Sequence, residues 1–314
     1  MYAIGIDMSK RSFHAAFDEH TVQVFTNTTT GVQAFVTALE GRGMTRTDTA
    51  IGVEATGAYH LLFCTYLREH DWPVRVINPL ESSKVIQAQS LRRVKTDRTD
   101  ALAVRQAVLL GLGYPFTDTR VVLALKALVV ERHGLVELRT TLKQQQEAHR
   151  VKQEAVGELH DSATPVLKAI RREVRIIEAR FQEYEPDTQV LLRSIPGIGV
   201  LSAAALVAFI GDINRFSTPD KLVAYIGLDA RVHESGTSVH GKGYISKRGN
   251  KYLRYILFNA AFIARQYHPG FKAYFEKKLK EGKHYFSAMC AIERKLIHLI
   301  WAVWTRGTPF EQRA

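Results

Sequence analysis

Two carboxylates three residues apart, in the stretch VKTDRTDALAV, have a spacing that could do chemistry. On a helix, side chains at positions i and i+3 share a face with Cβ atoms about 5–6 Å apart, so Asp97 and Asp100 would repel one another. One explanation is structural: Asp97 caps the helix and Asp100 is favoured in its first turn by the helix dipole. The other explanation is that the two acids share a cation.

Two further carboxylates favour the cation. Asp7 ends the apolar run YAIGID and Glu54 ends AIGVE, where an acid is unexpected unless something charged binds there. If these runs are neighbouring strands and the Asp97 helix crosses their ends, four carboxylates converge. Hard oxygen ligands suit Mg²⁺ or Mn²⁺, and two such ions about 3.5–4 Å apart promote phosphodiester transfer. The four acids therefore predict a catalytic divalent-metal site, and helix capping becomes the weaker explanation.

The elements that position these acids alternate along the first third of the chain. Three short runs, YAIGID, SFHAAF and TVQVFT, predict antiparallel strands. After them the pattern predicts a helix (GVQAFVTALEG), a strand (TAIGVE), a helix (AYHLLFCTYLREH), a strand (PVRVIN) and a helix from about Asp97 to Leu110. This order is typical of an α/β ribonuclease H-like fold, with a mixed sheet and helices on both faces.

The middle of the chain predicts two long helices. Thr164 and Pro165 supply a cap and a first helical position for the second helix. The helices pair either as a coiled coil or by packing within one subunit. Their apolar residues recur at helical spacing: Leu125, Leu128, Leu135, Leu138, Leu142, then Val166, Ile170, Val174, Ile177 and Phe181.

Positive charge is concentrated at one end of the chain. Residues 1–118 hold 12 Lys and Arg against 12 Asp and Glu, residues 119–189 hold 12 against 11, and residues 190–314 hold 19 against 8, a net charge of +11. We therefore predict a catalytic domain over 1–118, a helical linker over 119–189 and a mainly helical basic domain over 190–314. Such asymmetry indicates a polyanion partner, for which nucleic acid is the first choice.

Several protein classes are excluded by composition. The longest apolar run, LSAAALVAFIG, is about half of the ~20 residues that a membrane span requires, and we expect no membrane partner. Cys64 and Cys290 are far apart and lack CxxC spacing, so neither a disulfide framework nor a zinc site is indicated. No signal peptide is recognisable at the N-terminus, and the expected location is the cytoplasm.

Two motifs in the basic domain are candidates for binding nucleic acid. Gly197 and Gly199, in SIPGIG, resemble the turn of a helix-hairpin-helix that offers backbone N–H groups to a phosphate, although a tight turn between core helices explains them equally well. Cationic side chains and free N–H groups are expected to converge where the helix of ISKRGNKYLRYILFNAAF begins. The residues at that helix start are Lys247, Arg248, Asn250, Lys251 and Arg254.

Seven motifs, taken together and in order, resemble the DEDD transposases of the insertion-sequence one-ten family, which includes pilin-gene inverting recombinases. They are IGIDMSK, GVEATGAY, INP, KTDRTDA, IPGIG, AYIGLDARVHESG and ISKRGNKYLR. The resemblance implies a RuvC-like domain whose DEDD acids match Asp7, Glu54, Asp97 and Asp100. It also implies a transposase domain whose nucleophile, in the ESG motif, matches Ser235.

The family resemblance further implies the partners. They are double-stranded donor and target DNA, a non-coding guide RNA that pairs with both, and further copies of the chain in a dimer or tetramer. The protein would then be an RNA-guided recombinase associated with the nucleoid of a prokaryotic cell. Specificity would lie in the RNA, which this chain does not encode.

The residues alone leave alternatives open. Thr237, Ser238 and Ser246 lie in the same loop as Ser235, and spacing does not choose among them. A structure-specific endonuclease would use the same acids with water as the nucleophile. A non-catalytic nucleic-acid-binding protein would need neither the acids nor a nucleophile. IGIDMSK also resembles the opening of sugar-kinase and actin ATPase domains, but the glycine-rich hairpin that those domains need is missing from DMSKRSFHAAF. Because the acids and Ser235 lie in different domains, the site must assemble either by folding of one chain or by dimerisation through the long helices, and we expect assembly in trans between subunits.

Overall fold

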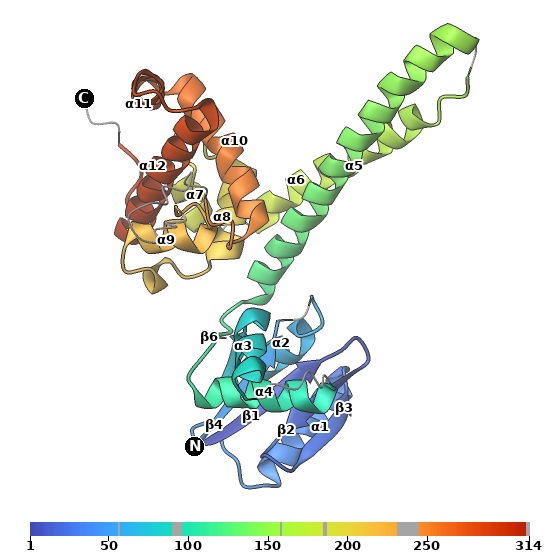
Figure 1. Ribbon diagram of the computed structural model, residues 1–314, viewed down its shortest axis with the longest axis vertical. Coiled ribbons are helices and arrows are strands. Elements are labelled where there is room, and N and C mark those ends of the chain that lie inside the picture. Colours follow the sequence, from blue (N-terminus) through green and yellow to red (C-terminus); the bar gives the residue numbers. More distant parts are fainter. Residues whose placement is uncertain (56, 90–95, 158, 185–186, 231–244, 312–314) are drawn as a thin grey trace, which may run out of the picture. The chain divides into compact units, whose positions relative to one another are not determined.

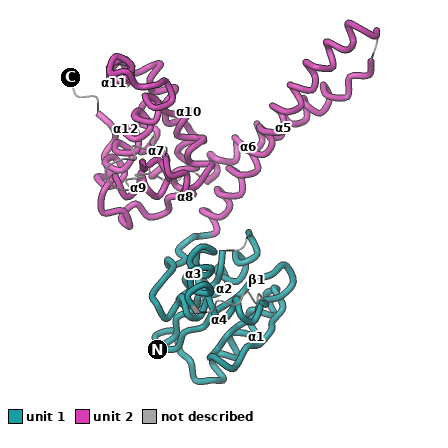
Figure 2. The backbone as a smooth tube through the Cα atoms, in the orientation of Figure 1, with its two compact units in different colours: residues 1–119 teal, residues 120–314 magenta. Residues whose placement is uncertain are grey.

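The computed structural model describes residues 1–311 except residues 56, 90–95, 158, 185–186 and 231–244. It divides the chain into two units, residues 1–119 and residues 120–314, which Figure 2 shows in different colours. The three-part division expected from charge and composition remains a prediction within this frame.

A six-stranded mixed sheet forms the centre of the first unit (Figure 1). Its strand order is β3-β2-β1-β4-β5-β6, with β1 parallel to β4, β4 parallel to β5, and the other pairs antiparallel. The predicted mixed sheet is confirmed, and its order is compatible with a ribonuclease H-like fold. The strands are β1 (Tyr2–Met8), β2 (Ser12–Ala16), β3 (Val22–Thr26), β4 (Thr49–Glu54), β5 (Val74–Ile77) and β6 (Tyr114–Pro115).

Helices cover both faces of this sheet. Phe13 of β2 contacts Phe35 of α1 (Thr29–Glu40) and Phe63 of α2 (Leu61–Glu69), with ring centroids 5.8 and 5.0 Å away. Since side chains alternate along a strand, Gly5 of β1 points to the opposite face, against α4 (Asp97–Leu109). The face covered by α1 and α2 is therefore an aromatic core, and the face covered by α4 carries the acids.

One helix of this unit was not predicted from the sequence. The helix α3 (Pro79–Gln89) follows β5, and Asn78 caps it by accepting a hydrogen bond from the Leu80 N–H at 2.9 Å. Pro79 occupies the first helical position, where its missing N–H costs nothing. The two-residue strand β6 was also missed, because so short a strand has no periodicity to recognise.

The second unit consists of helices. They are α5 (Arg120–Val156), α6 (Ala163–Glu183), α7 (Asp187–Leu192), α8 (Val200–Ile210), the 3₁₀ helix η1 (Ile213–Arg215), α9 (Pro219–Ile226), α10 (Lys251–Tyr267), α11 (Pro269–Lys280) and α12 (Tyr285–Arg306). The prediction of a mainly helical C-terminal part is confirmed.

The two long helices, α5 and α6, form an antiparallel hairpin within one chain (Figure 1). Arg132 pairs with Glu178 at 2.6 Å, and further along Gln146 donates a hydrogen bond to Thr164 at 2.8 Å. The hairpin therefore needs no second subunit to form. Whether α5 or α6 also makes a coiled coil with another copy stays a prediction.

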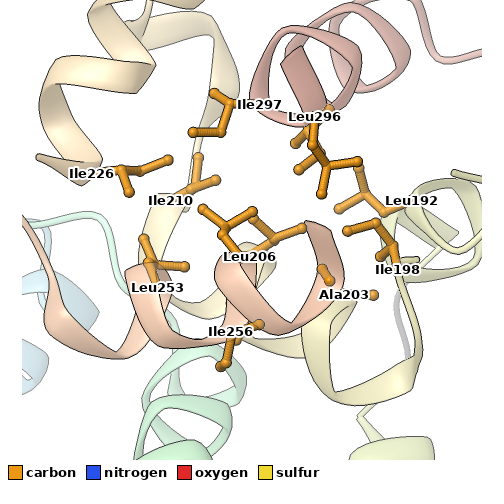
Figure 3. Close-up of a cluster of buried hydrophobic side chains, with 14 of the residues drawn as sticks. Leu192, Ile198, Ala203, Leu206, Ile210, Ile226, Leu253, Ile256, Leu296 and Ile297 are labelled. Carbon is orange, nitrogen blue, oxygen red and sulfur yellow. The ribbon is translucent and has the colours of Figure 1, made fainter. Parts of the chain in front are cut away.

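The core of the second unit is built around α8. This helix is apolar on all sides, and its small residues Ala203, Ala204, Ala205 and Ala208 are fully buried. Figure 3 shows Leu206 and Ile210 of α8 among side chains from α9, α10 and α12. Packing on this scale fixes α10 and α12, which carry much of the positive charge.

The part of the chain that the structure describes has no helix that combines the length and the apolar character needed to cross a membrane.

Candidate active site and nucleic-acid interface

Two glycines let α4 lie directly on the sheet. A Cβ on Gly5 would stand 2.2 Å from the carbonyl oxygen of Ala101, and a Cβ on Gly52 would stand 2.3 Å from Cγ2 of Val108. Both distances are shorter than any real van der Waals contact, so neither position has room for a side chain. Gly5 and Gly52 are register partners in β1 and β4, and together they make a smooth patch under the helix.

The direction of α4 brings its first turn to the end of β1. Arg105, in the second half of the helix, donates a hydrogen bond to the carbonyl oxygen of Ala3 at 3.1 Å, near the start of β1. The helix therefore runs opposite to the strand, and Asp97 arrives beside Asp7. One ligand atom each from Asp7, Asp97 and His14 lie within 4.8 Å of one another.

Asp97 does not cap this helix. Thr96 is the cap: its hydroxyl accepts a hydrogen bond from the Thr99 N–H at 3.2 Å, while the Thr99 hydroxyl accepts one from the Thr96 N–H at 2.9 Å. This reciprocal capping box satisfies the helix start without either aspartate. The capping explanation for Asp97 is therefore wrong, and its carboxylate, 67% exposed, remains available to a ligand.

The other three predicted acids all act electrostatically on Asp7. Burial and the negative charges of Asp100, Asp97 and Glu54 raise the pKa of Asp7 from 3.8 to about 6, and His14 opposes them. Such an arrangement is self-repelling in the absence of a cation. Carboxylate oxygens with one imidazole suit a small divalent ion, with oxygen ligands favouring Mg²⁺ and Mn²⁺. The donor set therefore fits a metal site.

The carboxylate of Glu54 is held by α3. Because Ile6 and Val53 are register partners, Glu54 and Asp7 come next to each other on the α4 face of the sheet. Ser82 of α3, only 2% exposed, donates a hydrogen bond to Oε2 of Glu54 at 2.5 Å. Asn78 and Pro79 start α3, so the motif INP has a structural role in orienting an acid of the site.

The sequence analysis missed three residues near the acids: His14, Ser82 and Asn27. His14 is the register partner of Asp7, and it is polar between the buried Phe13 and Ala15, so counting the β1–β2 hairpin register could have found it. Ser82 had no such signal because α3 itself was missed. The Asn27 side chain donates hydrogen bonds at 3.1 Å to the carbonyl oxygens of Ser9 and Tyr59, joining the loops that follow the Asp7 and Glu54 strands.

Ser235, Thr237 and Ser238 lie outside the described residues, but the base of their loop is described. Ala230 and Ile245, on either side of residues 231–244, form a β-bridge. Ser246, 3% exposed, donates a short hydrogen bond to the carboxylate of Asp229. Of the alternative hydroxyls, Ser246 therefore has a structural task at this base.

The five predicted basic and polar contacts near α10 divide into two groups. Asn250 caps α10 by accepting from the N–H groups of Tyr252 and Leu253 at 2.8 and 3.1 Å, and Nη1 of Arg254 donates to the carbonyl oxygens of Ile226 and Gly249 at 3.0 and 2.7 Å. These two side chains stabilise the turn. The side chains of Lys247, Arg248 and Lys251 are exposed beside it.

Lys247 has an unusual backbone. Its φ of 54° lies in the left-handed region, which a non-glycine residue enters only at a cost of roughly 1–3 kcal/mol. The Lys247 N–H donates to the carbonyl oxygen of Gly227 at 3.0 Å, which fixes this conformation. The turn therefore holds the backbone of Lys247 in place beside α10.

Gly197 has a packing role in the IPGIG turn. Its φ is +88°, and a Cβ there would stand 2.3 Å from the carbonyl oxygen of Ala260 in α10. Gly199 begins α8 and has open space where a Cβ would be. A tight turn on α10 explains Gly197, and phosphate binding by this turn stays a prediction.

Comparisons with known proteins match the two parts of the chain to two transposase families. Residues 4–150 match the IS110-type DEDD domain, described as a transposase, and residues 189–276 match the Transposase IS116/IS110/IS902 family. The Pilin gene-inverting protein of Moraxella lacunata is 27% identical over 318 aligned residues, covering 99% of this chain and 98% of that protein. The transposase for insertion sequence element IS1111A of Coxiella burnetii is 26% identical over 272 residues, covering 76% and 73%.

The first matched segment contains the four acids and the second contains Ser235 and the turn before α10. A DEDD transposase domain implies the use of a divalent metal, and a transposase implies DNA substrates. With both transposase segments present in one chain, and with similarity to a Pilin gene-inverting protein over nearly its whole length, the chain is a DNA transposase or recombinase and belongs to the IS110 family.

Proposed function

We propose that this protein is a site-specific recombinase that cuts and rejoins the DNA ends of a mobile element. Asp7, Glu54, Asp97 and Asp100 form its catalytic metal site, and Ser235 is its nucleophile. The observation that carries the proposal is the close packing of α4 on Gly5 and Gly52. Ligand atoms of Asp97, Asp7 and His14 thereby lie within 4.8 Å of one another.

The acids, with His14, would hold Mg²⁺ or Mn²⁺. When bound, the metal would promote ionisation of the attacking oxygen and stabilise charge on the leaving oxygen. The protein's own contribution is position: Ser82 orients Glu54, the register of β1 and β2 places His14 opposite Asp7, and α4 supplies the other two acids. The metal-free acids repel one another, and a bound cation would offset that repulsion.

The proposed covalent step is an exchange of phosphodiester bonds. Ser235 Oγ attacks a DNA phosphorus, the bond from that phosphorus to a deoxyribose oxygen breaks, the serine proton is released and the freed oxygen takes up a proton. Attack by a deoxyribose hydroxyl of another strand reverses these events and regenerates the serine. The phosphoserine conserves the energy of the broken bond, so rejoining needs no ATP.

The surroundings of the Ser235 loop support this role. Ser235 is five residues from Ala230, and five residues of chain span at most about 18 Å. Ala230 is tied to Ile245, next to the turn that exposes Lys247 and Arg248. Cations at the mouth of the loop would balance phosphate charge during the exchange.

The partners proposed are double-stranded donor and target DNA and a non-coding guide RNA. The net charge of +11 on residues 190–314 supports binding of nucleic acid. We further propose that dimers or tetramers act on nucleoid DNA in the prokaryotic cytoplasm, with the acids of one subunit serving the serine of another. Mixed dimers of Ser235→Ala and Asp7→Asn chains would then retain part of the activity, and their complete inactivity would contradict assembly in trans.

The function is tested by a strand cleavage and joining assay with element-end DNA, Mg²⁺ and any co-purifying RNA. The variant is Asp7→Asn, and the control is Asp71→Asn, an isosteric change at an exposed aspartate with φ of 59°, where Asn is also tolerated. Loss of cleavage and joining in Asp7→Asn alone is expected. Equal activity of both variants would contradict the proposal.

A structure-specific endonuclease is the second candidate. It is favoured by one observation: the acids by themselves form a metal-binding group, and water could replace the serine. This function predicts cleavage that survives Ser235→Ala and yields free ends that are not rejoined.

A further inference from the structure

The helices α11 and α12 pack against each other in the second unit (Figure 1). A basic groove lies between them. Its cavity measures about 410 Å³, and none of its residues belongs to the site proposed above. Lys278 and Tyr274 of α11 line one side, and Lys283 lines it from the turn that follows. The α12 side is lined by Ala291, Arg294, Lys295 and His298.

The α12 residues form one stripe. Their spacing of i, i+3, i+4 and i+7 places all four side chains on one helix face, with the small Ala291 leaving room for the groove. Arg294 and Lys295 bring two positive charges to this face, and an anion in the groove would offset them.

The carboxylates of the protein neutralise only part of this charge. Glu281 pairs with Lys278 at 2.8 Å, and Asp220 lies 3.8 Å from Arg294 and 3.4 Å from His298. Lys283 and Lys295 form no ion pair with any residue that the structure describes. Two ammonium groups are therefore left for an external anion.

The aromatic ring of Tyr274 in the groove lies against two of the cations. The Lys295 and Lys278 ammonium groups lie 4.5 and 5.3 Å from the centroid of the Tyr274 ring, within cation–π range. A ring already engaged by two cations is poorly placed to stack on a nucleic-acid base. The groove is therefore suited to recognising charge on a backbone rather than a base.

We propose that this groove binds the phosphodiester backbone of the nucleic acid on which the protein acts, with Lys283 and Lys295 as the principal contacts. This inference rests on the proposed function and adds a second contact surface to the turn before α10. A backbone ligand matches the residues available: two lysine ammonium groups that form no ion pair among the described residues, in a region whose net charge is +11.

The test compares two double variants of the full chain. Lys283→Ala with Lys295→Ala empties the groove of its unpaired cations, and Lys277→Ala with Lys280→Ala removes the same charge from exposed positions of α11 outside the groove. The affinity for labelled element-end duplex DNA and for single-stranded RNA is measured over a range of salt concentrations. Unfolding temperature and a Lys283→Arg, Lys295→Arg variant confirm that any loss comes from charge.

The groove variant is expected to bind about tenfold more weakly, with a salt slope reduced by about 1.8 on duplex DNA or about 1.4 on single strands, while the α11 control keeps most of its affinity. Loss confined to DNA or to RNA identifies which strand occupies the groove. Equal losses in both variants, or unchanged affinity in the groove variant, would overturn the inference. Wild-type protein that binds neither nucleic acid would instead overturn the proposed function itself.

Discussion

Gly5 of β1 and Gly52 of β4 are register partners, and α4 lies on both of them. The closest atom to a Cβ at Gly5 would be the backbone oxygen of Ala101, which cannot rotate away as a side chain can. This pair therefore sets the height of α4 above the sheet. It decides whether Asp97 comes within reach of Asp7.

Gly5→Ala is expected to lift α4 and separate the acids. Overpacking of this kind costs about 1–3 kcal/mol of stability, and misplacement of catalytic groups by about 1 Å can cost 10²-fold in rate. Cleavage assays and denaturant unfolding of the variant measure both effects. Gly134→Ala in α5, where a Cβ meets nothing within 4 Å, is the control and should be neutral or slightly stabilising. Wild-type activity in Gly5→Ala would contradict this role for the glycine pair.

Divalent metal is expected to stabilise the protein in a pH-dependent way. Because the pKa of Asp7 is raised from 3.8 to about 6, ionisation of this carboxyl costs the metal-free fold stability as the pH rises from about 4 to about 6. A bound cation offsets that cost, and below pH 6 protons compete with it. The rise in Tm on adding Mn²⁺ should be larger at pH 7.5 than at pH 5 and should shrink in Asp7→Asn. An equal rise at both pH values would contradict the prediction.

Ser82→Ala is expected to impair the site without unfolding it. The hydroxyl of Ser82 is buried and donates to Glu54, so its loss frees a carboxylate that must stay in place. Removing a partner that orients a metal ligand typically costs 10–100-fold in metal affinity or activity. The neighbouring Ser83→Ala, at an exposed position of α3, is the matched control. Metal titration and cleavage rates should separate the two variants, and indistinguishable values would refute a positioning role.

Glu293 of α12 makes the helical unit less stable as pH rises. Burial raises the pKa of this carboxyl from 4.5 to about 7, opposed by the positive charge of Arg254. The folded state therefore keeps a proton that the unfolded state loses, and stability falls between about pH 4.5 and pH 7. Glu293→Gln should flatten this fall and gain about 1–3 kcal/mol at pH 8. Denaturant unfolding from pH 5 to 8 measures it, with Glu276→Gln on the exposed face of α11 as control. A variant that loses stability at pH 8 would show that the electrostatic attraction of Arg254 outweighs burial.

Much of the first unit could be predicted from its sequence. Short apolar runs rich in β-branched and aromatic residues predicted β1 to β4, and an acid at the end of an apolar strand predicted Asp7 and Glu54 as site residues. The helix at Asp97 was predicted correctly, and the structure shows that Thr96 caps it, where the sequence had offered Asp97 as the weaker explanation of the acid pair. Both residues are good caps, and only the backbone hydrogen bonds distinguish them.

What could not be predicted depends on contacts distant in sequence. The α3 helix has a weak apolar face, so periodicity did not detect it. The contact between Ser82 and Glu54 was therefore missed as well. The exposure of Leu138 and Val166, 48% and 44%, departs from a helical pattern that marked both as apolar-face residues. The groove at Lys283 and Lys295 was invisible because those lysines come from a turn and a helix that meet only in the fold.

The nucleophile is the centre of this account, and a denaturing gel tests it most directly. Purified protein, any co-purifying RNA, labelled element-end DNA and Mg²⁺ are incubated, denatured and separated, with Ser235→Ala and Asp7→Asn beside the wild type. We predict a protein–DNA adduct that survives denaturation in the wild type and is missing from both variants. Cleaved DNA without an adduct, unchanged by Ser235→Ala and lost in Asp7→Asn, would contradict the serine mechanism and establish a metal-dependent nuclease.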